Sequence, residues 1–320
     1  VAGAGAPPGG AGRAASAGRA SWLSAGALGL VAARAALAAR RARGGADISD
    51  DLSVEKLTKK YSSQIDELRN TCKDVLDDQD DLYLLFFLLE SKGDVPAAAE
   101  NVREVLAWRK GEGAGIVATA EKAIAEATAG GGWNNEPVFA AAPNADKLKA
   151  FITPDCYVVL ALPSGDLMSV IRAAAIDSPK MMEAVTPEQL VDFFIYAREV
   201  NTCVADARTR ATGRLTKLIS ANDLTGVSSF PDSRFQEALT GSSKKAQRLY
   251  PGRQGPTVLL NLPWLARALV GLLAPLFPGA VRDKIKFART PMDYMEKLPD
   301  VLREPLRSQF LDDISAVLTS

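Results

Sequence analysis

The residues that could carry out chemistry in this chain are carboxylates, thiols and lysines, because the 320-residue sequence contains no histidine. This absence excludes catalytic triads, general bases and metal sites that depend on an imidazole. The three cysteines, Cys72, Cys156 and Cys203, are far apart and form no CxxC pair, so no zinc site can be recognised. Three thiols cannot form a complete set of disulfides, which favours a reducing compartment. We therefore expect neither a metal nor a cofactor.

Carboxylates are the remaining candidates for catalysis. Asp223 follows a predicted strand, and Glu183, Glu188 and Asp192 lie on predicted helices. In such positions a carboxylate more often caps a helix or faces solvent than takes part in acid–base chemistry, which needs a perturbed environment. The sequence predicts no catalytic residue, and we expect a binding protein that is not an enzyme.

The charge distribution separates a basic leader from an acidic body. The chain has 38 basic and 38 acidic residues, so its net charge of zero gives no electrostatic case for nucleic acid as a partner. Residues 1–46 contain six arginines and no acidic residue. This composition resembles an organelle transit peptide, with a plastid favoured over a mitochondrion; a disordered extension is the alternative. The leader could also contact a protein partner. Without a targeting role, the protein would be cytoplasmic or peripheral to a membrane.

Residues 47–125 are predicted to form a helical module. Asp80 precedes the apolar run LYLLFFLLE, which signals the start of a buried helix, and Asp94 can cap another helix with Pro96 in its first turn. An amphipathic stripe with spacings of mostly three and four comprises Leu52, Leu57, Ile65, Leu68, Cys72 and Val75. On the helix after Asp94, the apolar face comprises Val102, Val105 and Trp108. The residues expected to face water are Glu100, Arg103, Glu104 and Arg109.

From Tyr157 onward, predicted strands alternate with predicted helices. The strands lie at 157–162, 215–222 and 257–261, and the helices at 187–210 and 234–249. This alternation predicts parallel strands joined by helical crossovers, hence an α/β layer. An alanine-rich helix at 116–129 comes before the first strand. The glycine-rich segments beside it lack the GK[ST] of a phosphate-binding loop and are interpreted as hinges.

The most informative segment is the apolar stretch at 250–288. The hydropathy of Thr257–Phe277 within it suggests a membrane span. Pro263 and Pro275 interrupt that span, Arg267 would place a charge near its centre, and Asn261 lies inside it. A strand followed by an apolar helix on a folded domain fits better. In order, the stretch contains YPGRQG, an apolar strand, NLPWL, LAPL and RDKIKF.

These motifs resemble the CRAL-TRIO lipid-binding family, which includes phosphatidylinositol-transfer and cellular-retinaldehyde-binding relatives, and the chain looks like a divergent member. Residues 82–110 are similar to the family's N-terminal helical module, and DLTG at 223–226 matches the end of its central strand. The resemblance implies an α/β fold with a mainly parallel sheet, flanking helices and an apolar pocket closed by a gate helix. The implied domains are a leader at 1–46, the helical module at 47–125 and the lipid-binding domain at 126–320.

The resemblance also implies which residues form the pocket. The gate would lie at Leu272–Lys286, and the pocket and gate residues would be Leu269, Leu272, Leu273, Leu276, Phe277, Val281, Lys284 and Ile285. The pocket wall would be Phe194, Leu218, Val258, Leu260 and Trp264. Burial of a sixteen-carbon chain at about 0.8 kcal/mol per methylene would yield roughly 12 kcal/mol, enough for tight binding.

The chain departs from the phosphatidylinositol-binding branch at its headgroup positions. Gly252 replaces a glutamate after Tyr-Pro, Val281 replaces a threonine before the gate lysine Lys284, and Phe86 and Leu89 stand where that branch has arginines. An inositol phosphate needs several charge-assisted donors to offset its desolvation. We therefore expect a less polar ligand, such as a fatty acid, sterol, terpenoid or pigment.

Two functions follow from this interpretation. The first is binding of a hydrophobic ligand, with transfer between membranes and transient contact with a membrane surface. The second is a non-transferring scaffold or accessory subunit at a membrane or membrane complex, with the same fold and a cavity filled by its own side chains.

Overall fold

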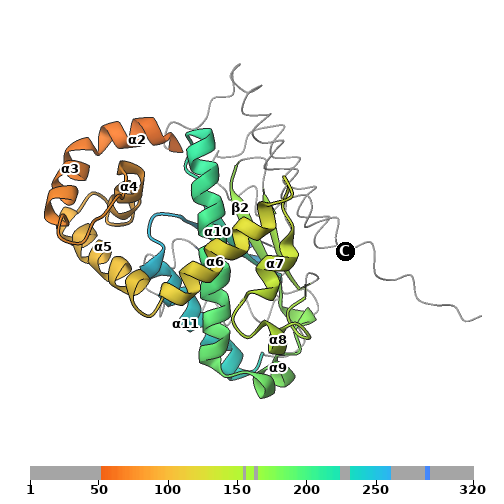
Figure 1. The fold of residues 1–320 in the computed structure, drawn as a ribbon. Coiled ribbons are helices and arrows are strands. Elements are labelled where there is room, and N and C mark those ends of the chain that lie inside the picture. The colour runs from red at the N-terminus through yellow and green to blue at the C-terminus, as the bar shows by residue number, and fades with distance from the viewer. Residues whose placement is uncertain (1–51, 154–155, 162–164, 224–230, 261–284, 289–320) are drawn as a thin grey trace, which may run out of the picture.

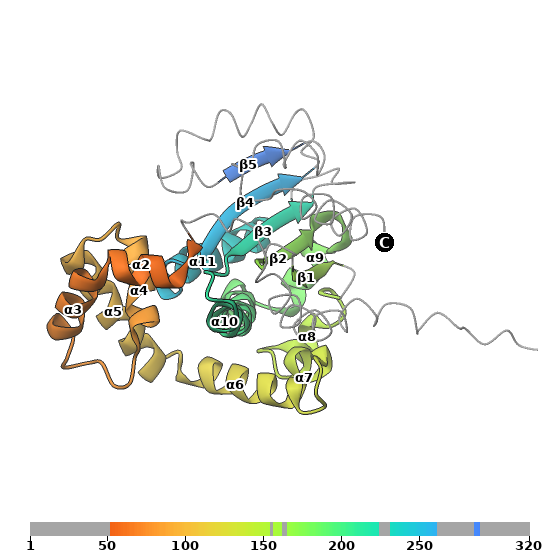
Figure 2. The ribbon, with the colours of Figure 1, turned by 90° about the horizontal axis from the view of Figure 1, so that it is seen from above.

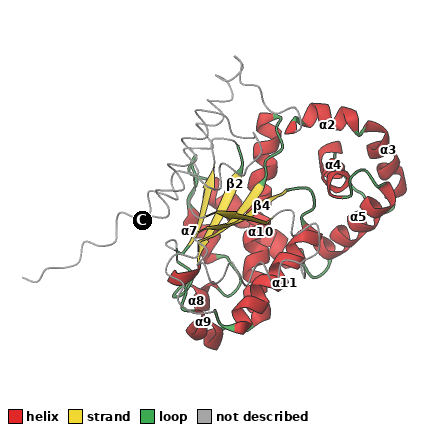
Figure 3. Ribbon diagram, turned by 180° about the vertical axis from the view of Figure 1, so that it is seen from behind, coloured by secondary structure: helices red, strands yellow, loops and turns green. Residues whose placement is uncertain are grey.

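The computed structural model describes residues 52–153, 156–161, 165–223, 231–260 and 285–288. Figure 1 shows a group of helices, α2 to α5, beside a mixed region that contains a sheet and the remaining labelled helices. The long helix α10 (Pro187–Thr212) lies between the two groups, as the view from behind in Figure 3 also shows. This arrangement confirms the expected α/β fold with a small helical module at its N-terminal side.

The N-terminal module begins and ends its helices where the local sequence predicts. Its members are α2 (Val54–Lys60), α3 (Ser62–Thr71), α4 (Asp81–Glu90) and α5 (Val95–Lys110). Asp80 caps α4 by accepting from the backbone N–H of Tyr83, and Asp94 caps α5 by accepting from that of Ala97. Both caps and the position of Pro96 in the first turn of α5 are as expected.

Helix α4 forms the centre of this module. Its residues from Leu82 to Leu88 are buried except for Tyr83, which is partly buried, so the helix is covered on nearly all sides. Leu57, Ile65, Leu68 and Cys72 of the predicted stripe pack into the same cluster. An all-apolar helix needs such a cover, because it has no polar face to turn toward water.

The second group of helices surrounds α10. Its other members are α6 (Ala114–Thr128), α7 (Asn135–Ala140), α8 (Ala145–Leu148), α9 (Ser178–Ala184) and α11 (Ser233–Leu249). Thr186 and Gln189 form a capping box that fixes the start of α10. The hydroxyl of Tyr196 on α10 donates to the carbonyl of Val138 at 2.8 Å, which joins α10 to α7.

The sheet has five described strands in the order β1-β2-β3-β4-β5. They are β1 (Tyr157–Ala161), β2 (Leu167–Arg172), β3 (Leu218–Asp223), β4 (Gln254–Leu260) and β5 (Ile285–Ala288). Strands β2 to β5 are parallel, and β1 is antiparallel to β2. The mainly parallel sheet is therefore confirmed.

Two strands correct the sequence interpretation. The strand at 157–162 was expected to join the parallel set, but β1 is an antiparallel edge strand and the unpredicted β2 takes the parallel position. Gly165, with φ +93°, precedes β2 and adopts a backbone conformation that glycine reaches easily. Strand β5 was also missed, because RDKIKF had been assigned in part to the gate helix.

The crossovers determine which face of the sheet the helices cover. Each parallel connection from β2 to β3 and from β3 to β4 advances in the same direction along the sheet, through α10 and α11 respectively. Right-handed crossovers then place both helices on the same face. Figure 2 shows α10 end-on beside the strands. Within the described residues, no helix combines the length and apolar character that crossing a membrane requires.

Candidate functional site

Two of the predicted pocket-wall residues lie where α10 meets the sheet. Phe194 on α10 is partly buried, and its ring meets that of Tyr157 on β1 edge-on, with centroids 6.5 Å apart. Leu218 at the start of β3 is buried in a cluster with Leu167 of β2 and Ala205 of α10. The structure therefore brings these two predicted residues to the same helix–sheet contact, at different positions along α10.

The other predicted wall residues are placed only in part. Val258 and Leu260 lie in β4, where Val258 pairs with Ala221 and Leu260 with Asp223 of β3. Trp264 lies outside the described residues. Strand β4 begins at Gln254, three residues before the predicted start at Thr257, so the YPGRQG motif leads directly into the sheet.

The predicted gate falls mostly outside the described residues. This applies to Leu269, Leu272, Leu273, Leu276, Phe277, Val281 and Lys284. Ile285 and Lys286 are described, and they lie in β5, paired with Thr257 and Val258 of β4. The predicted end of the gate helix at Lys286 is therefore wrong: hydrogen bonding along β4 takes these residues into the sheet.

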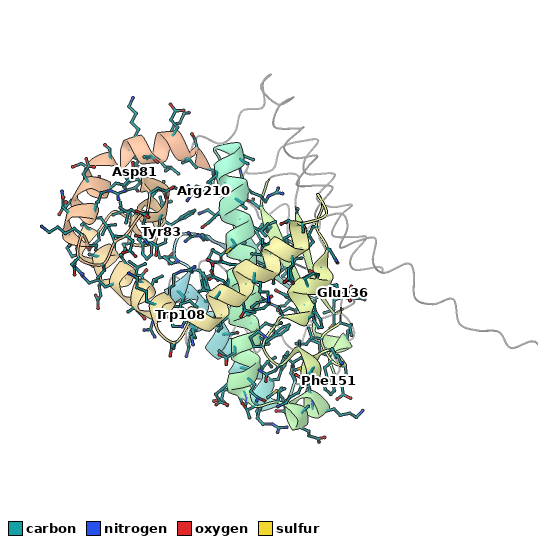
Figure 4. The ribbon with its side chains drawn as sticks, in the orientation of Figure 1. Asp81, Tyr83, Trp108, Glu136, Phe151 and Arg210 are labelled. Atoms are coloured by element: carbon teal, nitrogen blue, oxygen red, sulfur yellow. The ribbon has the colours of Figure 1, made fainter. Side chains whose placement is uncertain are left out.

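A cavity of about 390 Å³ lies between the N-terminal module and α10. Its walls come from α4, α5 and α10 and from the segment Tyr250–Arg253. Tyr83 on α4 and Arg210 on α10 are both wall residues, and Figure 4 labels them on the two neighbouring helices. We call this space the inter-module cavity.

Paired charges dominate the wall of the inter-module cavity. Arg109 of α5 makes two hydrogen bonds to Glu199 of α10, at 3.0 and 2.8 Å, and Glu199 is only 1% exposed. Arg253 makes two to Asp206, at 2.7 and 2.8 Å. Arg210 pairs with Asp80, the cap of α4. Each arginine on this wall thus has its own carboxylate, and the pairs Arg109–Glu199 and Arg210–Asp80 join the two modules.

Arg109 is a correction to the sequence interpretation. It was expected to face water with Glu100, Arg103 and Glu104, but α10 covers its side of α5. Burial by itself would lower the pKa of Arg109; the hydrogen bonds and charge of Glu199 outweigh that effect, so the pKa is raised. Sequence reasoning also missed Glu199, since nothing in the local pattern distinguishes it from a solvent-facing glutamate.

The thiol and two hydroxyls on the same wall are not set up for catalysis. Burial, reinforced by the charge of Glu199, raises the pKa of Cys203 to about 12, so this cysteine stays protonated and unreactive. The hydroxyls of Thr202 and Tyr83 are buried and have no hydrogen-bond partner among the residues that the structure describes. The Cys203 thiol donates to the carboxylate of Glu199 at 3.7 Å, but that carboxylate is already held by two hydrogen bonds from Arg109.

The carboxylates considered for catalysis are dispersed. Glu183 and Glu188 are exposed, as expected, and desolvation raises the pKa of Asp192. Asp223 is buried, contrary to the expectation of a solvated cap, and its carboxylate lies 3.9 Å from the guanidinium of Arg172. In the part of the chain that the structure describes, no cluster of three potential metal ligands occurs.

Gly252 is held tightly against α4. Its φ of +69° is one that side-chain-bearing residues rarely adopt, and a Cβ there would lie 2.3 Å from the carbonyl oxygen of Phe86. The Gly252 N–H donates to Glu90 at 3.1 Å. Beside it, the guanidinium of Arg253 lies 3.8 Å from the centroid of the buried Phe86 ring. The approach of Gly252 to the backbone of Phe86 leaves no room for a side chain at position 252.

Comparison with known proteins agrees with this arrangement of helices, sheet and YPGRQG segment. Residues 163–301 match the family model of the CRAL/TRIO domain. The resemblance to the CRAL/TRIO family is confirmed. A CRAL/TRIO domain implies binding of a lipid or another small hydrophobic ligand. Sheet strands β2 to β5 and helices α9 to α11 all lie within the matched residues.

The crystal structure of Sfh5 is 11% identical in sequence and aligns with a TM-score of 0.46, covering 82% of this chain and 97% of that one. No curated protein matches the chain.

Proposed function

We propose that this protein binds a hydrophobic, lipid-like molecule within its CRAL/TRIO region, transfers it between membranes and does not bind phosphatidylinositol. The CRAL/TRIO match supports the hydrophobic class of ligand. Transfer would require the predicted gate, which begins at Leu272, to open at a membrane surface, as the family resemblance implies. The protonated Cys203 and the dispersed carboxylates support a binding protein over an enzyme.

The contact between Gly252 and Phe86 carries the argument against phosphatidylinositol. A glutamate at position 252 would meet the backbone of α4, so the side chain that marks the phosphatidylinositol-binding branch cannot be accommodated. Phe86 is itself buried, and the neighbouring Arg253 is already neutralised by Asp206. An inositol phosphate would find few free donors here to offset its desolvation.

The test is native mass spectrometry of the purified full chain, followed by lipid extraction. One hydrophobic molecule per chain, other than phosphatidylinositol, would support the proposal. Recovery of stoichiometric phosphatidylinositol would refute the headgroup argument. If vesicles that carry fluorescent fatty acid and fluorescent phosphatidylinositol both fail to load the protein, the scaffold function would replace the binding function.

Transfer and targeting need separate measurements. Transfer is tested by the rate at which loaded protein moves the fluorescent ligand from donor to acceptor vesicles, compared with the rate without protein.

We further propose that residues 1–46 direct the protein to an organelle, because they combine arginines with an absence of acids. Fusion of these residues to a fluorescent protein should give plastid localisation; diffuse fluorescence would contradict it.

A further inference from the structure

One face of α10 turns toward the sheet at two points. Phe194 contacts Tyr157 of β1, and Ala205 packs with Leu167 of β2 and Leu218 of β3. Residues that follow Phe194 at spacings of four, three and four lie on the same face of a helix. Arg198 and Asn201 therefore lie between the two contacts, on the side of α10 that faces the sheet. We call this the sheet face of α10.

Arg198 differs in its partners from three other arginines of the two modules. Arg109, Arg214 and Arg253 each make two hydrogen bonds to one carboxylate: Glu199, Asp166 and Asp206 respectively. Arg198 is partly buried, yet its guanidinium makes no hydrogen bond or ion pair with any of the residues that the structure describes. Within the described part of the chain, its charge has no counterion.

The surroundings of Arg198 are polar but uncharged. Tyr157 and Tyr250 are its electrostatic neighbours, and a side-chain hydrogen bond joins Tyr157 to Asn201. Burial lowers the pKa of Arg198, and among the described residues the groups that act against this effect are Tyr157 and Tyr250, not a carboxylate. Glu199, the next residue, is turned away from the sheet face and is already bound to Arg109. An arginine keeps its charge even when buried, so this position favours an anion that comes from outside the protein.

We propose that Arg198 binds the acidic headgroup of the ligand, with Tyr157 and Asn201 beside it, and that the ligand is a long-chain carboxylic acid. The inference rests on the proposed function, since the acyl chain would occupy the hydrophobic pocket of the same domain. A guanidinium and a carboxylate match in geometry and can form two parallel hydrogen bonds. Among the described residues of this face, Arg198 supplies one positive charge, which balances a carboxylate and leaves a phosphate monoester undercompensated.

The experiment compares an acid with its own ester. The full chain is titrated with a naturally fluorescent polyene fatty acid and with the methyl ester of the same acid, which keeps the chain and loses the charge. The wild type is expected to bind the acid roughly 10-fold to 100-fold more tightly than the ester, the range of a hydrogen-bonded charged pair. Arg198→Gln should remove this preference and leave the affinity for the ester unchanged.

The outcomes separate this inference from the proposed function. Equal binding of acid and ester by the wild type would refute the role of Arg198 but keep the hydrophobic pocket. Binding of neither would refute the pocket itself. A lysophosphatidic acid that binds more tightly than the fatty acid would refute the carboxylate assignment. Since the wild-type comparison needs no variant, the inference stays testable even if Arg198→Gln does not fold.

A matched variant controls for loss of charge. Arg103→Gln removes one positive charge from the exposed surface of α5, where Arg103 pairs with Asp74. It should leave the preference for acid over ester unchanged. A similar loss of preference in Arg103→Gln and Arg198→Gln would mean that the net charge of the protein, and no specific contact, sets the preference, which would overturn the proposal.

Discussion

Two faces of α10 differ in how their charged side chains are paired. On the face toward the N-terminal module, Glu199, Asp206 and Arg210 are each paired with a side chain from another segment. On the sheet face, Arg198 has no such partner among the described residues. A face that docks against another part of the same chain can satisfy its charges permanently. A face that receives a ligand must keep one charge available, at a cost in stability when the ligand is absent.

The face of α10 toward the N-terminal module, with Glu199, Asp206 and Arg210, is called the docking face. The largest expected effect comes from breaking one of its ion pairs. Glu199→Gln would leave the partly buried guanidinium of Arg109 without its counterion. We expect a loss of about 2–4 kcal/mol in the free energy of unfolding, measured by urea denaturation, the lower end reflecting the partial access of Arg109 to water. The exposed pair of Arg103 and Asp74 is the control: Asp74→Asn should change stability by less than about 0.5 kcal/mol. Equal losses for the two pairs would contradict the argument.

Gly252 provides the second prediction, with Gly213 as a matched control. The two glycines have nearly the same φ, +69° and +68°, but a Cβ at 213 would meet nothing within 4 Å. Gly213→Ala should cost about 1 kcal/mol from backbone strain alone. Gly252→Ala should cost about 2–4 kcal/mol, because the clash with Phe86 adds to that strain. Similar values in thermal unfolding would show that α4 moves away readily and would weaken the case against phosphatidylinositol.

Arg198→Met tests the sheet face directly. Unlike Glu199→Gln, this substitution is not expected to lower the free energy of unfolding. Replacing a partly buried charge that has no partner among the described residues by an apolar side chain of similar length should leave the ligand-free protein as stable, or more stable by about 1 kcal/mol. The measurement is urea denaturation after lipid extraction, beside Glu199→Gln. A loss above about 1 kcal/mol would indicate that Arg198 holds the fold together, and the contrast between the two faces would fail.

The smallest effect concerns the exposed rim of the docking face. Hydrogen bonding to Arg210 lowers the pKa of Asp80 below its ordinary value of 3.8. A lowered folded-state pKa stabilises the protein above the unfolded-state pKa, and this contribution is lost as the pH falls through the folded-state value. Asp80→Asn keeps a good helix cap, so its cost should be under about 1 kcal/mol at pH 7 and smaller near pH 3. A cost independent of pH would assign the effect to the cap alone.

Local sequence determined the ends of the helices and the positions of most strands. Asp80, Asp94 and Thr186 cap their helices because each side chain accepts from a backbone N–H a few residues away, a contact that needs no distant partner. The YPGRQG segment and the apolar strand after it were also recognisable, and with them the placement of Leu218 and β4 in one sheet.

Tertiary structure decided the direction of β1 and the partners of the charges. Whether a strand runs parallel depends on where its neighbour lies, so the residues of β1 could not specify it once β2 had been missed. Glu199 and Arg198 are adjacent charged residues on one helix, and no local pattern assigns them different roles. Packing placed Glu199 against α5, where Arg109 compensates it, and turned Arg198 toward the sheet, where no described carboxylate does. A charge's environment is set by what covers it, and that cover comes from segments distant in the sequence.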